Sequence, residues 1–186
     1  MNDDYLNNLI NLVFSKNEEL KKHSLNVAYY MKAFGESLGL STEDVDMLEF
    51  CGLLHDIGKI YVPNELLLKP AGLTNSEFDT IKQHPCLSYN LLKDYSDIYP
   101  SALCHHERYD GRGYPSGCKG ESIPIVARIT SVCDSFDAMT EKRAYNNPMS
   151  YDDALKQLVV NRGTQFDSNI VNSFCNIFDY KIRKLK

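Results

Sequence analysis

The chain contains five histidines, and each of them lies in a short polar cluster. The clusters are EELKKH (Glu19, His23), HDIGK (His55, Asp56, Lys59), QHP (His84) and HHERYDGRGYP (His105, His106). A further carboxylate, Asp134, lies in the otherwise apolar run ITSVCDSFDAM. Imidazole nitrogens and carboxylate oxygens are the ligands that borderline and hard divalent cations prefer. These residues therefore predict a site for two or three divalent metal ions.

The spacing within two of these clusters has structural consequences. Residues four apart on a helix point to one face, so Glu19 and His23 are expected to reach one metal ion or two adjacent ones. Asp56 directly follows His55 at the predicted end of a helix, where a carboxylate can bridge two cations. Lys59 lies four residues after His55, so helical spacing places its ammonium group on the same face as the His55 imidazole.

Each of these residues also has an ordinary structural interpretation when it is taken alone. His23 on a helix is compatible with a surface or core histidine, and Lys59 with a solvated side chain. His105 and His106 together are compatible with a helix terminus, where the dipole favours a cation. Asp134 is compatible with a buried, hydrogen-bonded acid or a solvent-facing one. These ordinary interpretations are less convincing when all the residues are considered together, because each histidine would have to lie in a polar cluster by chance.

The elements that must position these residues are all helical. Apolar residues recur at helical spacing, and no convincing alternation of period two occurs between turn signals. We expect a single-domain bundle of about seven or more helices. The expected helices cover residues 3–14, 18–38, a segment from caps at 41–42 to HDIGK, 74–84, 87–93, a short segment ending at 105–106, 124–141, 150–163 and the chain from 167 onward. The glycines between residues 108 and 122 predict a structured loop instead.

Length and composition limit the class of protein. A chain of 186 residues with 43% hydrophobic residues can bury one core, which predicts one domain over residues 18–186 preceded by a helical extension over 1–17. No run of about 18 apolar residues and no signal-peptide pattern occurs, so we expect a cytoplasmic protein without a membrane partner. The net charge of −5 and the lack of a basic stripe argue against duplex nucleic acid. The six scattered cysteines are expected to be reduced and mostly buried.

The motifs resemble those of the HD-GYP subgroup of the HD phosphohydrolase superfamily, over nearly the whole chain. The matching strings are HDIGK, IYVPNELLLKP, KQHP, HHERYDGRGYP, the segment from IP at 123 to RAY at 145, and GTQFD. HDxGK alone would indicate only the superfamily, whereas the complete HHExxDGxGYP string is highly specific. The resemblance implies an all-helical fold, a cluster of iron or manganese ions, and hydrolysis of cyclic di-GMP to pGpG and onward to GMP.

The resemblance also implies roles for individual residues. The implied metal ligands are His23, His55, Asp56, His84, His105, His106 and Asp134. Glu19 occupies the place of a further glutamate in members with three metals, which favours a trinuclear site over a binuclear one. Lys59 is expected to approach the metals and the substrate phosphate, and Arg143 matches a phosphate-contacting arginine. Three positions depart from the pattern, namely Asn26 for arginine, Ser88 for glycine and Asn146 for a basic residue.

These roles lead to a hypothesis for the mechanism. Two cations about 3.5–4 Å apart would share a water molecule and lower its pKa to near 7. Asp56 and Lys59 are the expected catalytic residues, with Asp56 bridging the cations while Lys59 and Arg143 brace phosphate oxygens. Arg112 and Tyr114 would shape a guanine pocket by stacking, or alternatively their loop fixes its own shape or docks a partner. Ligation needs neutral imidazoles, so metal loss is expected as the pH falls.

Two other classes of function remain open at this stage. One is a nucleotidase of the HD type that acts on another nucleotide or cyclic dinucleotide. The other is a non-catalytic module that responds to cyclic di-GMP and docks onto a GGDEF-type cyclase or another signalling protein. Oxidation of an iron cluster, or of the nearby Cys104 or Cys133, is a hypothesis for regulation.

Overall fold

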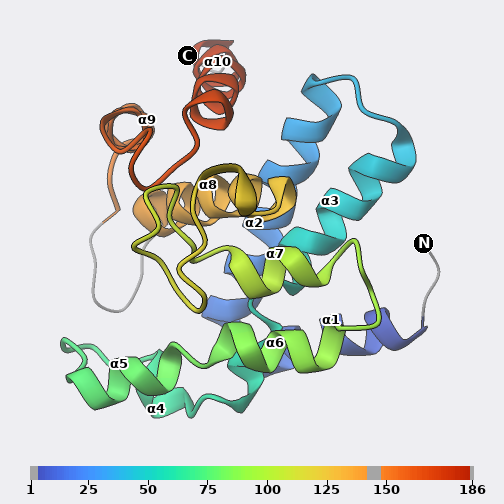
Figure 1. Ribbon diagram of the computed structural model, residues 1–186, viewed down its shortest axis with the longest axis vertical. Helices are drawn as coiled ribbons and strands as arrows, with labels where there is room; N and C mark the ends of the chain where they lie inside the picture. Colours follow the sequence, from blue (N-terminus) through green and yellow to red (C-terminus); the bar gives the residue numbers. More distant parts are fainter. Residues whose placement is uncertain (1–3, 142–147, 185–186) are drawn as a thin grey trace.

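The computed structural model describes residues 4–141 and 148–184, which form ten α-helices and two 3-10 helices (Figure 1). In chain order the elements are α1 (Asp4–Lys16), α2 (Glu18–Ser37), α3 (Thr42–Leu54), η1 (Ile57–Tyr61), α4 (Asn64–Leu67), α5 (Asn75–Ile81), α6 (His84–Leu92), α7 (Tyr99–Cys104), η2 (Gly120–Ser122), α8 (Ile125–Thr140), α9 (Tyr151–Val160) and α10 (Ser168–Lys184). Within these residues the extended pairing is limited to one bridge between Arg162 and Phe166. The predicted all-α fold is confirmed.

Side-chain caps start several of these helices where the sequence predicts them. Ser41 accepts a hydrogen bond from the backbone of Asp44 at the start of α3, and Ser150 caps α9 in the same way. Thr74 and Glu77 form a complete capping box at α5. The predicted C-terminal end of the helix over 74–84 was wrong, because α5 ends at Ile81. Pro85 lies in the first turn of α6, where its missing N–H leaves no hydrogen bond unmade, so it starts a helix instead of kinking one.

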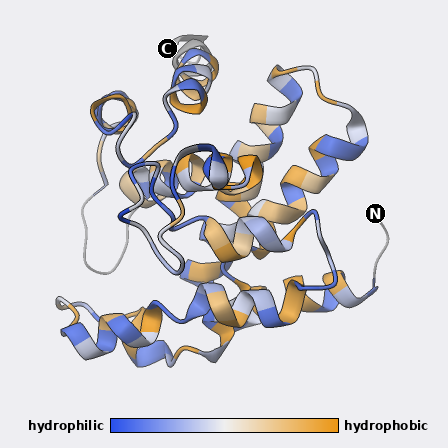
Figure 2. Ribbon diagram, viewed as in Figure 1, coloured by the Kyte–Doolittle hydropathy of each residue, from blue (hydrophilic) through white to orange (hydrophobic). Residues whose placement is uncertain are grey.

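The core is built around α2 and α8, which lie side by side in the middle of the molecule (Figure 1). Met31 of α2 and Phe136 of α8 are fully buried, and the Phe136 ring also contacts Phe174 of α10. Hydrophilic and hydrophobic residues alternate along most helices in Figure 2, which is the pattern of helices with one buried face. This packing fixes α2 and α8 relative to each other, and both carry candidate metal ligands.

The N-terminal extension shares this core. Leu6, Leu9 and Val13 of α1 are buried, and α1 packs against α2, α3 and η1. The Lys16 ammonium donates a hydrogen bond to the carbonyl of Ile60 in η1, the element that begins within HDIGK. Residues 4–16 therefore support the segment that carries the candidate ligands.

A close helix crossing brings the first two ligand clusters together. A Cβ on Gly52 of α3 would lie 2.5 Å from Cα of Ala28 in α2, so only glycine lets the two backbones approach this closely. On α2 the crossing lies five residues after His23, and on α3 it lies three residues before His55. Gly52 therefore helps to set the distance between these two histidines.

The glycine-rich segment over residues 108–122 is a loop, as predicted, up to the short 3-10 helix η2 at its end, and it is held at several points. The backbone amides of Tyr109 and Asp110 donate to the carbonyls of Gln165 and Thr164, at 3.1 and 2.8 Å. The Arg108 guanidinium pairs with the Asp110 carboxylate and holds the pKa of Asp110 at about 2. The loop is therefore anchored to the segment just before α10.

Among the described residues, no helix is both long and apolar enough to cross a membrane. Three of the six cysteines (Cys51, Cys104 and Cys133) are buried, so the expectation that most of them are buried was wrong. Burial raises the pKa of Cys51 to about 12 and that of Cys104 to about 11, and it raises the pKa of Cys133 as well. These thiols therefore stay protonated at neutral pH. Regulation through Cys104 or Cys133 stays a prediction.

Candidate metal centre

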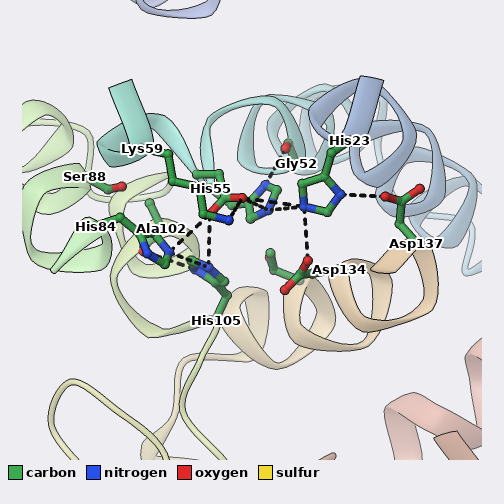
Figure 3. A network of polar contacts seen from close by, with 12 residues as sticks. His23, Gly52, His55, Lys59, His84, Ser88, Ala102, His105, Asp134 and Asp137 are labelled. Carbon is green, nitrogen blue, oxygen red and sulfur yellow. Dashed lines mark hydrogen bonds and ion pairs between the residues drawn. The ribbon is translucent and has the colours of Figure 1, made fainter. Parts of the chain in front are cut away.

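Seven of the eight predicted ligands converge from six helices or their ends onto one largely buried cluster. Figure 3 labels His23, His55, His84, His105 and Asp134, whose side chains gather at this cluster. The seven ligands form two groups, each with ligand atoms within 4.8 Å of one another, namely Asp56, His84, His105 and His106 in the first group and His23, His55 and Asp134 in the second. The histidines and Asp56 lie at helix ends or on inward helix faces, while Asp134 projects from the middle of α8. Each group has the number and type of ligands that hold one divalent cation.

Asp56 connects the two groups. Its Oδ1 lies 3.1 Å from Nε2 of His84 and 3.6 Å from Nε2 of His105, both in the first group. Its Oδ2 lies 3.4 Å from Nε2 of His55 and 3.6 Å from Nε2 of His23, both in the second group. Each carboxylate oxygen thus faces a different group, which is the arrangement of a bridging ligand.

The buried polar atoms of the cluster fit a cation. Three histidines place Nδ1 at hydrogen-bond distance from backbone carbonyls of the preceding turn, namely His55 with Gly52, His84 with Ile81 and His105 with Ser101, at 2.8 to 3.1 Å. A carbonyl only accepts, so Nδ1 carries the proton and Nε2 presents a lone pair.

These lone pairs lie close together without a proton between them. Nε2 of His55 is 3.2 Å from Nε2 of His23, and Nε2 of His84 is 3.4 Å from Nε2 of His105. Within the described part of the chain, Asp56 Oδ1 is buried and accepts no hydrogen bond. A buried acceptor without a partner is costly, and a cation coordinated by these atoms would satisfy them.

Asp137 belongs to the site although the sequence analysis does not identify it. Its carboxylate is 1% exposed, and Oδ2 lies 2.6 Å from Nδ1 of His23. Asn26, one of the departures from the family pattern, donates to Oδ1 of Asp137 at 2.7 Å. A carboxylate behind a histidine ligand fixes the ring and its tautomer. The available signal was the spacing, because Asp137 lies three residues after Asp134 on the same helix face.

Two predicted residues lie beside the cluster. Glu19 is exposed and belongs to neither ligand group. It lines a cavity of about 510 Å³ together with His23 and Lys59. The Lys59 ammonium lies 2.5 Å from Oδ2 of Asp56. A third metal at Glu19 stays a prediction, and Arg143 lies outside the described residues.

A second cavity, of about 300 Å³, reaches the cluster at other ligands. It is lined by His105, His106 and Asp134, and by Arg112 and Tyr114 of the glycine-rich loop. The two predicted guanine contacts therefore border the cluster. The cluster is accessible from two cavities with different linings.

Burial controls the protonation of the cluster. It lowers the pKa of His55 to about 4, and it also lowers the pKa of His84 and that of His106. Burial alone would raise the pKa of Asp56, but Lys59 and His55 hold this pKa well below its usual range. The site at neutral pH therefore presents neutral imidazoles and an ionised carboxylate, which are the forms that bind metal.

We expect acid to destabilise the metal-free protein in a defined window. The pKa values of His55, His84 and His106 are lower in the folded protein than in the unfolded chain, where the value is about 6.5. The unfolded chain then binds more protons, so the free energy of unfolding should fall as the pH drops from about 6.5 towards 4. The depressed pKa of Asp56 adds a loss only at lower pH. Urea unfolding of chelator-treated protein at several pH values measures this, and constant stability between pH 7 and 5 would contradict it.

Comparisons with known proteins agree with this geometry. The family model described as HD domain matches residues 7–170. The chain is 45% identical over 143 residues to the cyclic di-GMP phosphodiesterase response regulator RpfG of Xanthomonas campestris, covering 74% of this chain and 38% of that protein. It is 37% identical over 153 residues to the 3'3'-cGAMP-specific phosphodiesterase 1 of Vibrio cholerae, covering 79% of this chain and 35% of that protein. The chain thus spans less than half the length of either relative.

A solved structure shares the fold. The HD domain of the Listeria monocytogenes phosphodiesterase PgpH, in complex with cyclic-di-AMP, superimposes with a TM-score of 0.71 at 16% sequence identity. The match covers 96% of this chain and 97% of that one. At this identity the likeness concerns the fold alone.

Proposed function

Because this chain belongs to the HD domain family, in its HD-GYP branch, we propose that it is a metal-dependent phosphodiesterase that hydrolyses cyclic di-GMP to pGpG and onward to GMP. The observation that carries the proposal is the position of Asp56, which belongs to one ligand group and has its other carboxylate oxygen facing the second. When bound, two divalent cations would activate a water molecule for attack and neutralise charge on the phosphoryl oxygens. The proposed reaction would take place in the cytoplasm.

The side chains of this protein prepare the site for that chemistry. The neutral imidazoles of both groups present lone pairs, and the mixture of imidazole and carboxylate supports iron or manganese. Lys59 is half-buried at the edge of the larger cavity and can donate to a phosphate oxygen while it pairs with Asp56. We therefore propose Asp56 and Lys59 as the catalytic residues, and two divalent cations as the smallest number of metal ions per chain.

The two cavities support a substrate with two nucleotide units. The larger cavity combines apolar walls from residues 66–73 with Lys59 at the cluster, which suits a base and its phosphate. The smaller cavity carries the exposed Arg112, whose guanidinium can stack on or pair with guanine. Arg143 remains a proposed phosphate contact on the strength of the family pattern alone.

A second candidate is hydrolysis of a different cyclic dinucleotide. The relative in Vibrio cholerae is named for 3'3'-cGAMP, and both cavities could accept adenine as well as guanine by size. The interaction module that docks onto a GGDEF-type cyclase or another signalling protein is less well supported, because seven ligands are retained and converge.

The test is turnover by anaerobically purified protein. Cyclic di-GMP, 3'3'-cGAMP and cyclic di-AMP are supplied at equal concentration, products are separated by chromatography, and metals are counted in the same sample. We expect pGpG or GMP from cyclic di-GMP with at least two metals per chain. Chelation should abolish turnover, and Mn²⁺ or Fe²⁺ should restore it.

The other outcomes separate the candidates. Faster cleavage of 3'3'-cGAMP would replace the proposed substrate by the second candidate. Binding of cyclic di-GMP without product, at full metal content, would replace the enzyme by the interaction module.

A further inference from the structure

His106 is oriented differently from the other histidines of the cluster. His23, His55, His84 and His105 each hold Nδ1 in a polar contact with a carboxylate or a backbone carbonyl. Within the described part of the chain, no hydrogen bond to the His106 ring is found. Its ring is instead stacked on Tyr114, with the centroids 4.8 Å apart and the planes at 23°. The other four histidine rings are held by a polar partner at Nδ1, whereas the His106 ring is held by stacking on Tyr114.

The loop that carries Tyr114 folds directly back onto His106. The Tyr114 amide donates to the carbonyl of His106 at 3.3 Å. A Cβ on Gly113 would lie 2.5 Å from that carbonyl oxygen and 2.4 Å from the amide nitrogen of Arg108, so the close approach requires glycine. The ring and backbone of Tyr114 therefore both contact the residue that we assign as a metal ligand.

The buried carboxylate of Glu107 holds the residues that follow Tyr114 in the loop. Glu107 is 3% exposed, and its Oε1 accepts hydrogen bonds from the amides of Ser116 and Gly117, at 2.7 and 3.1 Å. Because Glu107 directly follows His106, these hydrogen bonds tie the part of the loop just after Tyr114 to the ligand segment. The loop is held rigidly enough to position a ring.

The contacts of Tyr114 use its ring and not its hydroxyl. The side chain is half-buried, and the Lys82 ammonium lies over the ring, 5.5 Å from the centroid, where a cation is attracted by the π face. Within the described residues, the hydroxyl makes no hydrogen bond. Burial raises the pKa of the Tyr114 phenol, so the hydroxyl stays neutral. Phenylalanine should therefore do the same work at this position.

We propose that Tyr114 is a positioning residue that holds the His106 imidazole in its metal-binding orientation by stacking. The proposal rests on the metal centre of the proposed function and adds a third interpretation of the loop to the two that the sequence leaves open. It assigns Tyr114 to the metal site, and leaves Arg112 as the guanine contact of the smaller cavity.

The experiment measures metal binding without any substrate. Wild type, Tyr114→Phe, Tyr114→Leu and His106→Ala are stripped with chelator and titrated with Mn²⁺, by calorimetry and by metal analysis after gel filtration. We expect Tyr114→Phe to bind as the wild type does. Tyr114→Leu should weaken by about 10–100-fold the same binding step that His106→Ala weakens, which is the usual effect of losing a partner of a metal ligand.

A double variant tests whether Tyr114 acts through His106. Tyr114→Leu added to His106→Ala should cause no further loss of affinity, because the ring that is positioned has gone. Tyr114→Met, whose flexible side chain fills the same space, replaces Tyr114→Leu if circular dichroism shows that the leucine variant is unfolded.

Two results would overturn the proposal. One is a titration of Tyr114→Leu that matches the wild type, with only KM for cyclic di-GMP raised, which would make Tyr114 a base contact. The other is that Tyr114→Leu weakens a Mn²⁺-binding step that His106→Ala leaves unchanged. Both titrations use Mn²⁺ alone and decide the proposal even if cyclic di-GMP is not the substrate; KM for cyclic di-GMP is needed only to assign Tyr114 as a base contact.

Discussion

Replacement of Asp56 by alanine is expected to lower turnover of cyclic di-GMP by about 10³-fold, the scale of losing one strong electrostatic group at a reaction centre. Asp56 has one oxygen facing each ligand group, and it also holds the Lys59 ammonium at 2.5 Å. Its loss should remove the bridge between the cations and leave five imidazoles with a single carboxylate, Asp134. We therefore expect the metal content to fall below two per chain. Turnover and metal analysis of one sample measure both effects.

The matched variant is Asp56→Asn, which keeps the shape of the side chain and removes its charge. It should lose metal and activity as the alanine variant does, while circular dichroism shows an intact fold. Asp153→Asn is the control, because Asp153 is an exposed carboxylate that pairs with Lys156 on α9, away from the cluster. If Asp56→Asn kept both metals and wild-type turnover, the bridging role would be wrong.

The convergence of the ligands could be predicted because its signals are local. His55 and Asp56 stand at a helix end marked by the glycine of HDIGK, and His105 and His106 precede a run of glycines. Helix stops of this kind are visible in a sequence, and polar residues next to them are conspicuous in an otherwise apolar pattern. Asp134 is less distinctive, because the same helix also carries Arg128 and Asp137.

The remaining parts of the site depend on packing between distant segments. The contact of His23 with Asp137 joins residues 114 apart, and it exists because α2 and α8 lie side by side. The stacking of Tyr114 on His106 depends on the direction in which the loop folds back. Helical periodicity predicts which face is buried and does not predict the partner of that face.

Gly58 of HDIGK shows a further constraint that only the packing reveals. A Cβ at this position would lie 2.1 Å from the carbonyl oxygen of His84 and 2.8 Å from the amide nitrogen of Ser88. The Gly58 amide also donates to the Ser88 hydroxyl at 2.9 Å. The hydroxyl of Ser88, a departure from the glycine of the family pattern, thus binds η1 to α6. The backbone of η1 is in direct contact with the helix turn that presents His84.

Replacement of Gly58 by alanine is expected to destabilise the protein by about 1–3 kcal/mol, the usual cost of forcing an extra group into a packed interior. The added methyl must push the His84 backbone away, and a displacement of about 1 Å at a reaction centre costs on the order of 10²-fold in rate. Urea unfolding and turnover measure the two effects. Gly72→Ala is the matched control for stability, because a Cβ on Gly72 meets no atom within 4 Å and its φ is not positive. If Gly58→Ala were as stable as Gly72→Ala and as active as the wild type, the contact between η1 and α6 would not position His84. A loss of stability and turnover confined to Gly58→Ala would instead show that Gly58 helps to position the metal site, since a substitution at a residue that is not itself a ligand would have displaced His84.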